Sequence, residues 1–418
     1  MQREPIPRLP VFGWQALRGR RDAAVPCLLD LPGLHYTTSG RASILLALQA
    51  LGVGQGDGVL VPTYHCPTMV APAADLGAVP VFYPIDERGA PDLAWLSRQN
   101  LSHVRVMLAA HYFGLPQPMG DIRRWCTGHG ISLIEDCAHA LFGRSGERPI
   151  GAWGDIAIAS LTKFLPVPEG GCLVMNSGAR LPPLRDCGAT THLRAAVDIL
   201  EVGALQQRLA GFNGLILGSL AALRRLSGRG AATATPATAK AQIKDNNGGG
   251  HTEALHSETN NNADFSIDFD LAHRQLARPC RWVASAMPRE RIVALRRRNY
   301  ELLQQRLAGH NGLHPMLPLL TPYCAPYVFP LWVDHPDPGY AELRRLEMPV
   351  FRWDRLWPGV PQMPGDHGLR WSHHVLQLAC HQDLTEADFE RFIGALLRLY
   401  ASPGRQSERQ TTEALEQR

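Results

Sequence analysis

Lysine is nearly absent from this chain of 418 residues, because only three of its 42 basic residues are lysine. They are Lys163, Lys240 and Lys244, and arginine fills every other basic position. Such a bias is consistent with genome composition, so each lysine that remains needs an explanation of its own. The 38 acidic residues nearly balance the basic ones and leave a net charge of +4, which indicates neither nucleic-acid nor membrane-surface binding.

Long apolar runs and paired metal-ligand spacings are absent as well. No segment approaches the roughly 18 apolar residues of a membrane helix, and the N-terminus lacks the apolar core of a signal peptide. The nine cysteines are scattered singly without a C-x-x-C, which indicates neither a zinc site nor a disulfide framework. We therefore expect a soluble, cytoplasmic protein without a bound metal.

What the chain does contain, from about residue 35 to 180, is an alternation of apolar runs with amphipathic segments. The runs are short and continuous, as in strands that helices cover on both faces. Strands are expected at 59–65, 79–86, 104–114, 131–143, 156–164 and 170–176, and helices at 40–52, 67–77, 92–100 and 118–129. The pattern predicts an α/β fold with a mostly parallel, doubly wound sheet.

The composition changes after a helical region at 190–227. Residues 228–264 are rich in Ala and Thr and then in Gly and Asn, without periodicity, so we interpret them as a flexible low-complexity insertion. After it come an arginine-rich helix at 288–309 and signals of a smaller C-terminal α+β domain. The predicted division is an N-terminal segment 1–35, a large domain 36–227, the insertion, a helical linker with the smaller domain at 265–400, and a polar tail 401–418.

Lys163 stands at the end of an apolar strand, in S-L-T-K-F-L-P. Burial at such a place removes hydration from the ammonium group, lowers its pKa and favours the neutral, nucleophilic amine that Schiff-base chemistry needs. The ordinary alternative is a lysine that extends from a sheet edge into water. Because arginine serves at nearly every other basic position, we favour the functional interpretation.

Two further features precede Lys163 on successive βα units. The segment T-S-G-R-A-S (38–43) opens a helix, where Ser39, Arg41 and Ser43 add donors to the free amides and suit a phosphate. Asp136, in I-E-D-C-A-H-A, ends a predicted parallel strand, where it is placed to hold a pyridinium N–H. Alone, Asp136 is better explained as a turn former or helix N-cap. The ordered combination of cradle, carboxylate and lysine is more specific than any member.

With these residues the chain resembles the DegT/StrS type of sugar aminotransferases, which depend on pyridoxal 5′-phosphate (PLP) and belong to fold type I of the aspartate aminotransferase superfamily. The resemblance covers about 36–176 and, more loosely, W-S-H-H-V-L-Q-L-A-C-H-Q-D-L-T at 371–385. The matching stretches include S-G-R-A-S-I-L-L-A-L-Q-A-L-G-V-G-Q-G-D-G-V-L-V-P, G-I-S-L-I-E-D-C-A-H-A and G-D-I-A-I-A-S-L-T-K. The resemblance implies PLP as the cofactor and a homodimer.

The resemblance also implies roles for individual residues. Lys163 falls on the lysine that binds PLP as a Schiff base and moves a proton between the amino donor and the cofactor. Asp136 falls on the aspartate that binds the pyridine nitrogen. His139 falls near the phenolic oxygen of the cofactor, where the family has glutamine or sometimes histidine. Taken alone, His139 is equally explained as a satisfied buried histidine.

For the phosphate, the resemblance implies that Gly40 and Arg41 form the backbone cradle and that Ser160 reaches the phosphate group. Arg41 stands where threonine is usual. The gap from Ser160 to Lys163 is about two residues shorter than in the family, so the lysine turn must be built differently.

The aromatic side chain that stacks on the PLP ring should align near Cys66, in T-Y-H-C-P. Tyr64 or His65 is a candidate for that role, or the stack is missing. The residues that a partner subunit would contribute cannot be located, since the chain diverges through 186–280.

The activity that the resemblance implies is ping-pong transfer of an amino group, with glutamate as the donor, to a keto group of a nucleotide-linked sugar. The product would enter polysaccharide or secondary-metabolite synthesis. Relatives that dehydrate sugars carry histidine in place of the lysine, so Lys163 favours transamination. We expect small-molecule substrates, and neither nucleic acid nor membrane, as partners.

Other interpretations stay open. One is a PLP-dependent dehydratase or lyase that acts on a non-sugar substrate. Another is a nucleophilic-cysteine enzyme using Cys137 and His139, which would share a strand face. The last is a non-catalytic regulatory or binding protein with the PLP fold, whose arginine-rich helix at 288–309 contacts nucleic acid.

Overall fold

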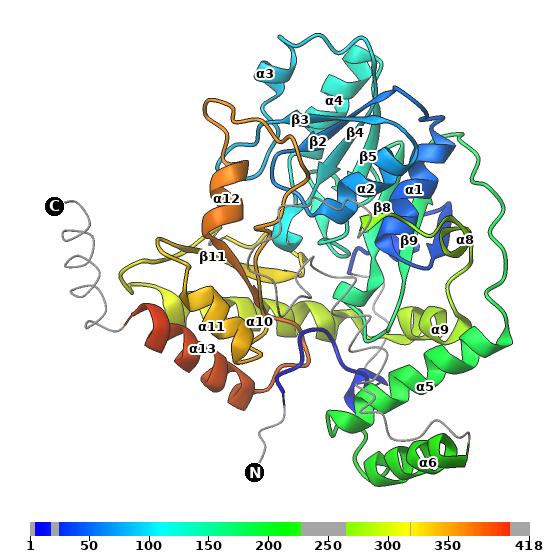
Figure 1. The fold of residues 1–418 in the computed structure, drawn as a ribbon, viewed down its shortest axis with the longest axis vertical. Helices are drawn as coiled ribbons and strands as arrows, with labels where there is room; N and C mark the ends of the chain where they lie inside the picture. Colours follow the sequence, from blue (N-terminus) through cyan, green and yellow to red (C-terminus); the bar gives the residue numbers. More distant parts are fainter. Residues whose placement is uncertain (1–4, 18–24, 227–264, 318, 402–418) are drawn as a thin grey trace.

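The structure is a computed structural model that describes residues 5–17, 25–226, 265–317 and 319–401 (Figure 1). The insertion predicted at 228–264, with Lys240 and Lys244, lies outside the described residues, as does the polar tail from 402 onward. No helix among the described residues is long and apolar enough to cross a membrane.

Seven strands form the central sheet, in the order β1-β9-β8-β5-β4-β2-β3. Five of them run parallel: β2 (Gly58–Pro62), β3 (Val79–Tyr83), β4 (Val104–Ala110), β5 (Ser132–Asp136) and β8 (Ile156–Ser160). At one edge β9 (Gly171–Met175) pairs antiparallel with both β8 and β1 (Leu34–Thr37), so β9 alone is reversed in this sheet. Every residue of β2 and β8 is buried, as strands covered on both faces require. The predicted mostly parallel sheet is confirmed.

Helices connect and cover these strands: α1 (Gly40–Ala50), α2 (Pro67–Asp75), α3 (Leu93–Leu96) and α4 (Met119–His129). Helix α1 begins where Ser39 Oγ accepts the Ala42 N–H, a side-chain cap that satisfies one amide of the first turn. Residues 42–48 of α1 are all buried, because the helix packs against β8 and β9 on one side and α2 on another. The start of α1 is thereby held at the edge of the sheet.

The helical region predicted at 190–227 is two helices that lie side by side, α5 (Ala189–Leu205) and α6 (Asn213–Leu226) (Figure 1). The chain leaves α5 through Gln207, whose φ is 54°, and Gly211, whose φ is 87°. Left-handed backbone at two positions ends a helix, so the predicted helical region is divided here.

The C-terminal part has its own antiparallel sheet, in the order β10-β11-β13-β12. Its strands are β10 (Leu313–Pro315), β11 (Val328–Val333), β12 (Val350–Phe351) and β13 (Val375–Ala379). Its helices are α10 (Arg289–Leu307), α11 (Gly339–Arg345), α12 (Gly368–His374) and α13 (Glu386–Tyr400). Two helices that precede α10 in the chain, α8 (Phe269–Ala272) and α9 (Arg278–Ala286), pack instead against α1 and α5 of the large domain. A capping box of Thr385 and Asp388 starts α13. The smaller α+β domain of the prediction is confirmed.

The remaining elements are short. They are the 3₁₀ helices η1 (Trp14–Leu17), η2 (Leu28–Asp30), η3 (Tyr112–Gly114) and η4 (Leu161–Lys163), and the two-residue strands β6 (Arg144–Ser145) and β7 (Arg148–Pro149).

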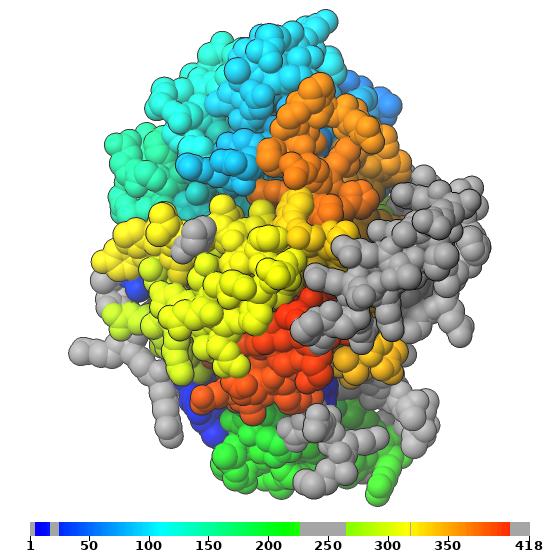
Figure 2. Space-filling model, turned by 90° about the vertical axis from the view of Figure 1, so that its left-hand side faces the viewer, coloured from blue at the N-terminus to red at the C-terminus, as the bar shows by residue number. Residues whose placement is uncertain are grey.

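The segment from β12 to α12 joins the two domains. Figure 2 shows this orange segment against the cyan part of the large domain. Asp366 Oδ1 accepts the Thr63 hydroxyl (2.8 Å) and the Ile85 N–H (3.0 Å), just beyond the carboxyl ends of β2 and β3. The ring of Trp371 lies 5.5 Å from that of Phe113. The C-terminal domain therefore rests on the end of the large sheet at which parallel strands finish.

Candidate functional site

A cavity with about 980 Å³ of empty space, part of it open to solvent, lies at the carboxyl ends of β4, β5 and β8. Open α/β sheets bind ligands at this end. Its polar and aromatic lining consists of Thr38, Ser39, Arg41, Cys66, Thr68, His111, Tyr112, Asp136, His139, Ser160, Thr162, Lys163, Glu169 and Trp353. Of the eleven residues that the sequence predicts for the site, eight line this cavity, Gly40 included, and Ser43, Tyr64 and His65 do not.

Lys163 ends the 3₁₀ turn η4, directly after β8. Its Nζ lies 5.1 Å from the centre of the Tyr327 ring, and its carbonyl accepts a hydrogen bond from Arg296 at 2.7 Å. Burial lowers the pKa of Lys163, and the negative charge of Asp136 opposes this shift only in part. The cavity therefore presents an amine with an enlarged neutral fraction, from the one lysine in the described part of the chain.

Asp136 is the last residue of β5 and is 3% exposed. Its Oδ1 accepts the Ala138 N–H at 2.8 Å. Burial raises the pKa of Asp136, while the Ala138 hydrogen bond and the charges of Lys163 and His111 pull it down. A cationic N–H that entered the cavity beside this carboxylate would stabilise its ionised form.

At the start of α1 the cavity wall is rich in hydrogen-bond donors, in contrast to the carboxylate of Asp136. Helix geometry leaves the first amides without intrahelical acceptors, and the positive end of the helix dipole favours an anion there. A Cβ at Gly40 would lie 3.3 Å from Ser160 Cβ, a tight contact that would require Ser160 to move by a few tenths of an ångström. Ser160 Oγ in turn lies 3.4 Å from Thr162 Oγ1. Gly40, Ser160 and Thr162 thus gather around one small space.

Arg41 and Ser43, two polar residues near the start of α1, lie in different surroundings. Arg41 lines the cavity and donates to the Phe265 carbonyl at 3.2 Å. Ser43 is buried instead, where its Oγ contacts Thr37 Oγ1 at 2.7 Å and donates to Ser39 O. The donor role predicted for Ser43 is wrong, because one turn along the helix its side chain faces the protein interior.

His139 lines the cavity beside two aromatic rings, those of Tyr327 (4.5 Å between centroids) and Trp353 (5.0 Å). Burial lowers the pKa of His139, and the charge of Lys163 lowers it further. Its Nδ1 accepts the Phe113 N–H at 3.4 Å, so the neutral ring carries its proton on Nε2. His139 is therefore a neutral hydrogen-bond donor in the cavity wall.

Cys66, rather than Tyr64 or His65, reaches the cavity. Tyr64 is fully buried, accepts from Gln377 Nε2 at 3.0 Å and packs 4.9 Å from the Trp353 ring. His65 is also fully buried, stacked on Phe82. The structure thus does not bring either ring to the position at which it would stack on a ligand, since both are held by contacts within the protein.

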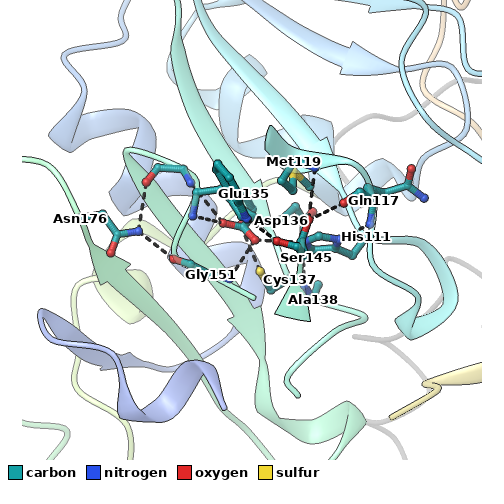
Figure 3. A network of polar contacts seen from close by, with 12 residues as sticks. His111, Gln117, Met119, Glu135, Asp136, Cys137, Ala138, Ser145, Gly151 and Asn176 are labelled. Atoms are coloured by element: carbon teal, nitrogen blue, oxygen red, sulfur yellow. Dashed lines mark hydrogen bonds and ion pairs between the residues drawn. The ribbon is translucent and has the colours of Figure 1, made fainter. Parts of the chain in front are cut away.

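Figure 3 shows the polar network behind the cavity, with Glu135 at its centre. His111, which follows β4 and lines the cavity, donates from Nε2 to Glu135 Oε1 (3.0 Å) and accepts the Gln117 N–H at Nδ1 (2.9 Å). The N–H groups of Gly151, Trp153 and Gly154 also donate to Glu135. Burial alone would raise the pKa of Glu135, but His111 and these amides outweigh it and hold the pKa below its usual range. The network fixes the orientation of His111.

Cys137 faces this network and not the cavity. Its Sγ donates to the Glu135 carbonyl at 3.7 Å, and burial raises the pKa of the thiol well above its usual value. His111, Glu135 and Cys137 place one ligand atom each within 4.8 Å of one another, but both carboxylate oxygens of Glu135 already accept N–H groups. His139 lies in the cavity wall, so Cys137 and His139 do not form the nucleophilic pair considered from the sequence.

Arg296, in the middle of α10, holds the lysine turn from the other domain. Its guanidinium is fully buried and donates to the carbonyls of Lys163 (2.7 Å) and Pro326 (2.9 Å) and to Gln382 Oε1 (2.8 Å). Gln382 in turn donates to the Phe164 carbonyl at 2.9 Å. Burial lowers the pKa of Arg296 to about 10. The closing motif at 371–385 thus fastens the turn that carries Lys163.

Other arginines of α10 serve the fold in the same way. Arg289 forms an ion pair with Asp30, Arg291 with Asp383 (3.1 Å) and Arg306 with Glu390 (2.7 Å). An arginine-rich sequence therefore does not produce a free basic stripe along this helix, and the nucleic-acid interpretation gains no support from it.

The sequence did not single out His111, Arg296 or Trp353. His111 had a usable signal, because it lies near the carboxyl end of the strand predicted at 104–114, just as Asp136 ends the parallel strand β5. Arg296 is one of three consecutive arginines, and nothing local distinguishes it. Trp353 lies in a loop far along the chain, and only the domain arrangement brings it to the cavity.

Comparison with known proteins shows that part of this chain is similar to known aminotransferases. Residues 35–213 match the DegT/DnrJ/EryC1/StrS aminotransferase family. The chain is 31% identical over 172 residues to the GDP-perosamine synthase of Vibrio cholerae, which covers 40% of this chain and 47% of the relative. It is 30% identical over 177 residues to the L-glutamine:2-deoxy-scyllo-inosose aminotransferase of Streptoalloteichus tenebrarius, 40% of this chain and 42% of the relative. The chain thus spans about half the length of these curated relatives.

The fold extends further than the sequence match. The crystal structure of the aminotransferase TlmJ from Streptoalloteichus hindustanus superposes with a TM-score of 0.57 and 19% identity, over 88% of this chain and 85% of TlmJ. This agreement confirms the predicted fold, that of the fold type I aminotransferases, across both domains.

Proposed function

Because residues 35–213 belong to the DegT/DnrJ/EryC1/StrS aminotransferase family, we propose that this chain is a PLP-dependent aminotransferase. It moves an amino group from glutamate to a keto group of a nucleotide-linked sugar. The observation that carries the proposal is the convergence of Lys163, Asp136 and the start of α1 on one cavity.

The residues present fit PLP. The cofactor has a phosphate, a basic ring nitrogen and an aldehyde, and the cavity offers a helix N-terminus, a buried carboxylate and a lysine. The phosphate cradle is built for a close approach, since a Cβ at Gly40 would enter the space beside Ser160. Ser39 and Thr162 add hydroxyl groups to the same wall. Each end of the cofactor therefore has a matching group in the chain.

PLP, when bound, supplies an electron sink that lets the amino donor lose the proton on its Cα. Asp136 holds the ring nitrogen in its protonated form, because the buried carboxylate gains a charge-assisted partner there. Lys163 Nζ takes up the Cα proton and returns it, a role that its lowered pKa favours near neutral pH. The neutral ring of His139 offers its Nε2–H to the bound cofactor. The Tyr327 ring beside Lys163 keeps water away from the amine.

The acceptor class follows from the named relatives. GDP-perosamine synthase supports a nucleotide-linked sugar, and the scyllo-inosose enzyme supports a cyclic polyol ketone with glutamine as donor. Lysine at position 163 supports transamination over the dehydratase or lyase alternatives, and an intact cavity argues against a purely regulatory role. We further propose that the enzyme acts as a homodimer in the cytoplasm.

The test uses purified protein supplied with PLP. We expect absorbance in the visible that depends on covalent attachment to Lys163, and we expect Lys163→Ala to abolish it. A parent without this band, or a variant that keeps it, would refute the cofactor assignment. A screen of keto-sugar nucleotides and scyllo-inosose ketones with glutamate or glutamine, followed by release of the 2-oxo acid, then identifies donor and acceptor.

A further inference from the structure

The C-terminal domain contributes one aromatic ring to the cavity wall, that of Trp353. It stands two residues after β12 and is only 7% exposed, whereas Asp354 and Arg355, which follow it, are exposed. A large indole directed inward from an exposed loop is held there by contacts with the large domain.

Those contacts locate the ring. Its centroid lies 4.9 Å from the Tyr64 ring and 5.0 Å from the His139 ring. Tyr64 precedes Cys66 by two residues, and His139 follows Asp136 by three. The indole therefore lies close to the segment that carries Cys66 and to the turn that follows β5.

The segment that follows β2 brings no aromatic ring of its own to the cavity lining. Cys66 contributes a thiol, whose Sγ contacts Thr68 Oγ1 at 3.0 Å, while Tyr64 and His65 are turned away. On the side of the sheet, Ala138 and Ile158 from the ends of β5 and β8 line the cavity. A flat ligand held between Asp136 and Lys163 thus has small aliphatic groups on the sheet side and needs a cover on the other.

We propose that Trp353 covers the ring of the bound cofactor, in place of an aromatic side chain at position 66. The inference rests on the proposed function, since it concerns where PLP binds. An electron-rich indole stacks favourably on a protonated, electron-poor pyridine ring, and a thiol supplies no such surface. The cofactor of the large domain is then enclosed by a residue of the C-terminal domain.

The loop that carries Trp353 is fixed on both sides. Trp357 N–H donates to His65 Nε2 at 2.9 Å, which ties the loop to the start of α2. Arg355 lies 4.5 Å above the Phe265 ring, and the Phe265 carbonyl accepts from Arg41 at the start of α1. The loop is thus linked to the cradle and to the Cys66 segment, so the indole is in place before a ligand binds.

The test measures PLP binding to the apo form of the full chain, by quenching of tryptophan fluorescence and by visible absorbance. We expect Trp353→Ala to raise the Kd for PLP roughly three- to tenfold, the range of an aromatic stack. Trp353→Phe should keep nearly the parental Kd and lose much of the quenching. Trp357→Phe, from the same loop but outside the cavity lining, is the matched control and should keep both.

A second-site variant separates stacking from general damage. Cys66→Phe added to Trp353→Ala should restore the Kd, because it returns an aromatic ring to the same side of the cavity. An unchanged Kd in Trp353→Ala, or unchanged quenching in Trp353→Phe, would overturn the inference while the Lys163-dependent band of the parent keeps the proposed function intact. A parent without that band would refute the proposed function and this inference with it.

Discussion

In the large domain, the residues that line the cavity stand at the ends of strands and the start of a helix, whereas the C-terminal domain lines the cavity from a loop and holds the lysine turn from the middle of a helix. Asp136 ends β5, Lys163 follows β8 and Gly40 begins α1. Trp353 comes from the loop after β12, and Arg296 from the body of α10. The first group is placed by its own elements and the second by the packing of two domains.

This difference suggests a division of work. The large domain supplies groups that would act on a ligand: an amine, a carboxylate and amide donors. The C-terminal domain supplies enclosure and positioning, through an indole and a buried guanidinium. Changes in the large domain should therefore alter chemistry more than stability, and changes in the C-terminal domain should do the reverse.

The largest effect is expected for Asp136→Asn. The side chain keeps its shape and can still accept the Ala138 N–H, so the free energy of unfolding should change by less than about 1 kcal/mol. Loss of the carboxylate should slow the half-reaction with glutamate about a thousandfold, roughly 4 kcal/mol of barrier. Rapid mixing with glutamate and urea unfolding measure the two quantities. Asp121→Asn, at an exposed position in α4, is the control, and a rate within tenfold of the parent would contradict the assignment of Asp136.

For Arg296→Met we expect a larger effect on stability than on chemistry. The variant leaves the carbonyls of Lys163 and Pro326 and the amide of Gln382 without their donor, which should cost about 4 kcal/mol of unfolding free energy. The urea midpoint reports this loss. Arg298→Met on the same helix is exposed and should change it by less than about 0.5 kcal/mol. Equal stability of the two variants would show that α10 does not fasten the lysine turn.

The same contrast explains which parts were predictable from the sequence. Short apolar runs between amphipathic helices specify a buried parallel sheet, and a parallel sheet brings the carboxyl ends of its strands together. The positions of Asp136 and Lys163 on one cavity follow from that rule alone. The sequence pattern also indicated the smaller C-terminal α+β domain.

Prediction failed where side-chain direction depended on neighbours. Tyr64, His65 and Cys66 are consecutive, and only the aromatic cluster around Tyr64 and the stack of His65 on Phe82 decide that Cys66 is the one to reach the cavity. Trp353 is almost 290 positions from Cys66, and no local pattern connects them. Such contacts depend on how two domains pack, which a single sequence does not display.

His65 lies where the two domains meet and should make that contact sensitive to acid. Burial lowers its pKa from 6.5 to about 4. The unfolded chain therefore takes up a proton near pH 6.5 while the folded chain resists until about pH 4, so stability falls as the pH decreases through this window and this group adds nothing further below it. The expected loss is about 3 kcal/mol.

The measurement compares urea unfolding at pH 7 and pH 4.5. His65→Gln can still donate to Pro62 O and accept from Trp357 N, but it does not titrate, so it should lose clearly less stability on acidification than the parent. The exposed His335→Gln serves as the control and should behave as the parent does. If His65→Gln and the parent lose the same free energy, the acid sensitivity lies elsewhere.

The smallest effect is expected in the large domain, for the variant Gly40→Ala. Its added Cβ in Gly40→Ala would lie 3.3 Å from Ser160 Cβ, in the space that the phosphate of PLP would share with the amides of α1. Stability should hardly change, because alanine suits the first turn of a helix, whereas the Kd for PLP should rise about fivefold, close to 1 kcal/mol. Gly214→Ala in the first turn of α6 meets nothing within 4 Å and should leave the Kd unchanged. Equal Kd values for both alanine variants would mean that the start of α1 is not the phosphate cradle, and the large domain would then supply only the amine and the carboxylate.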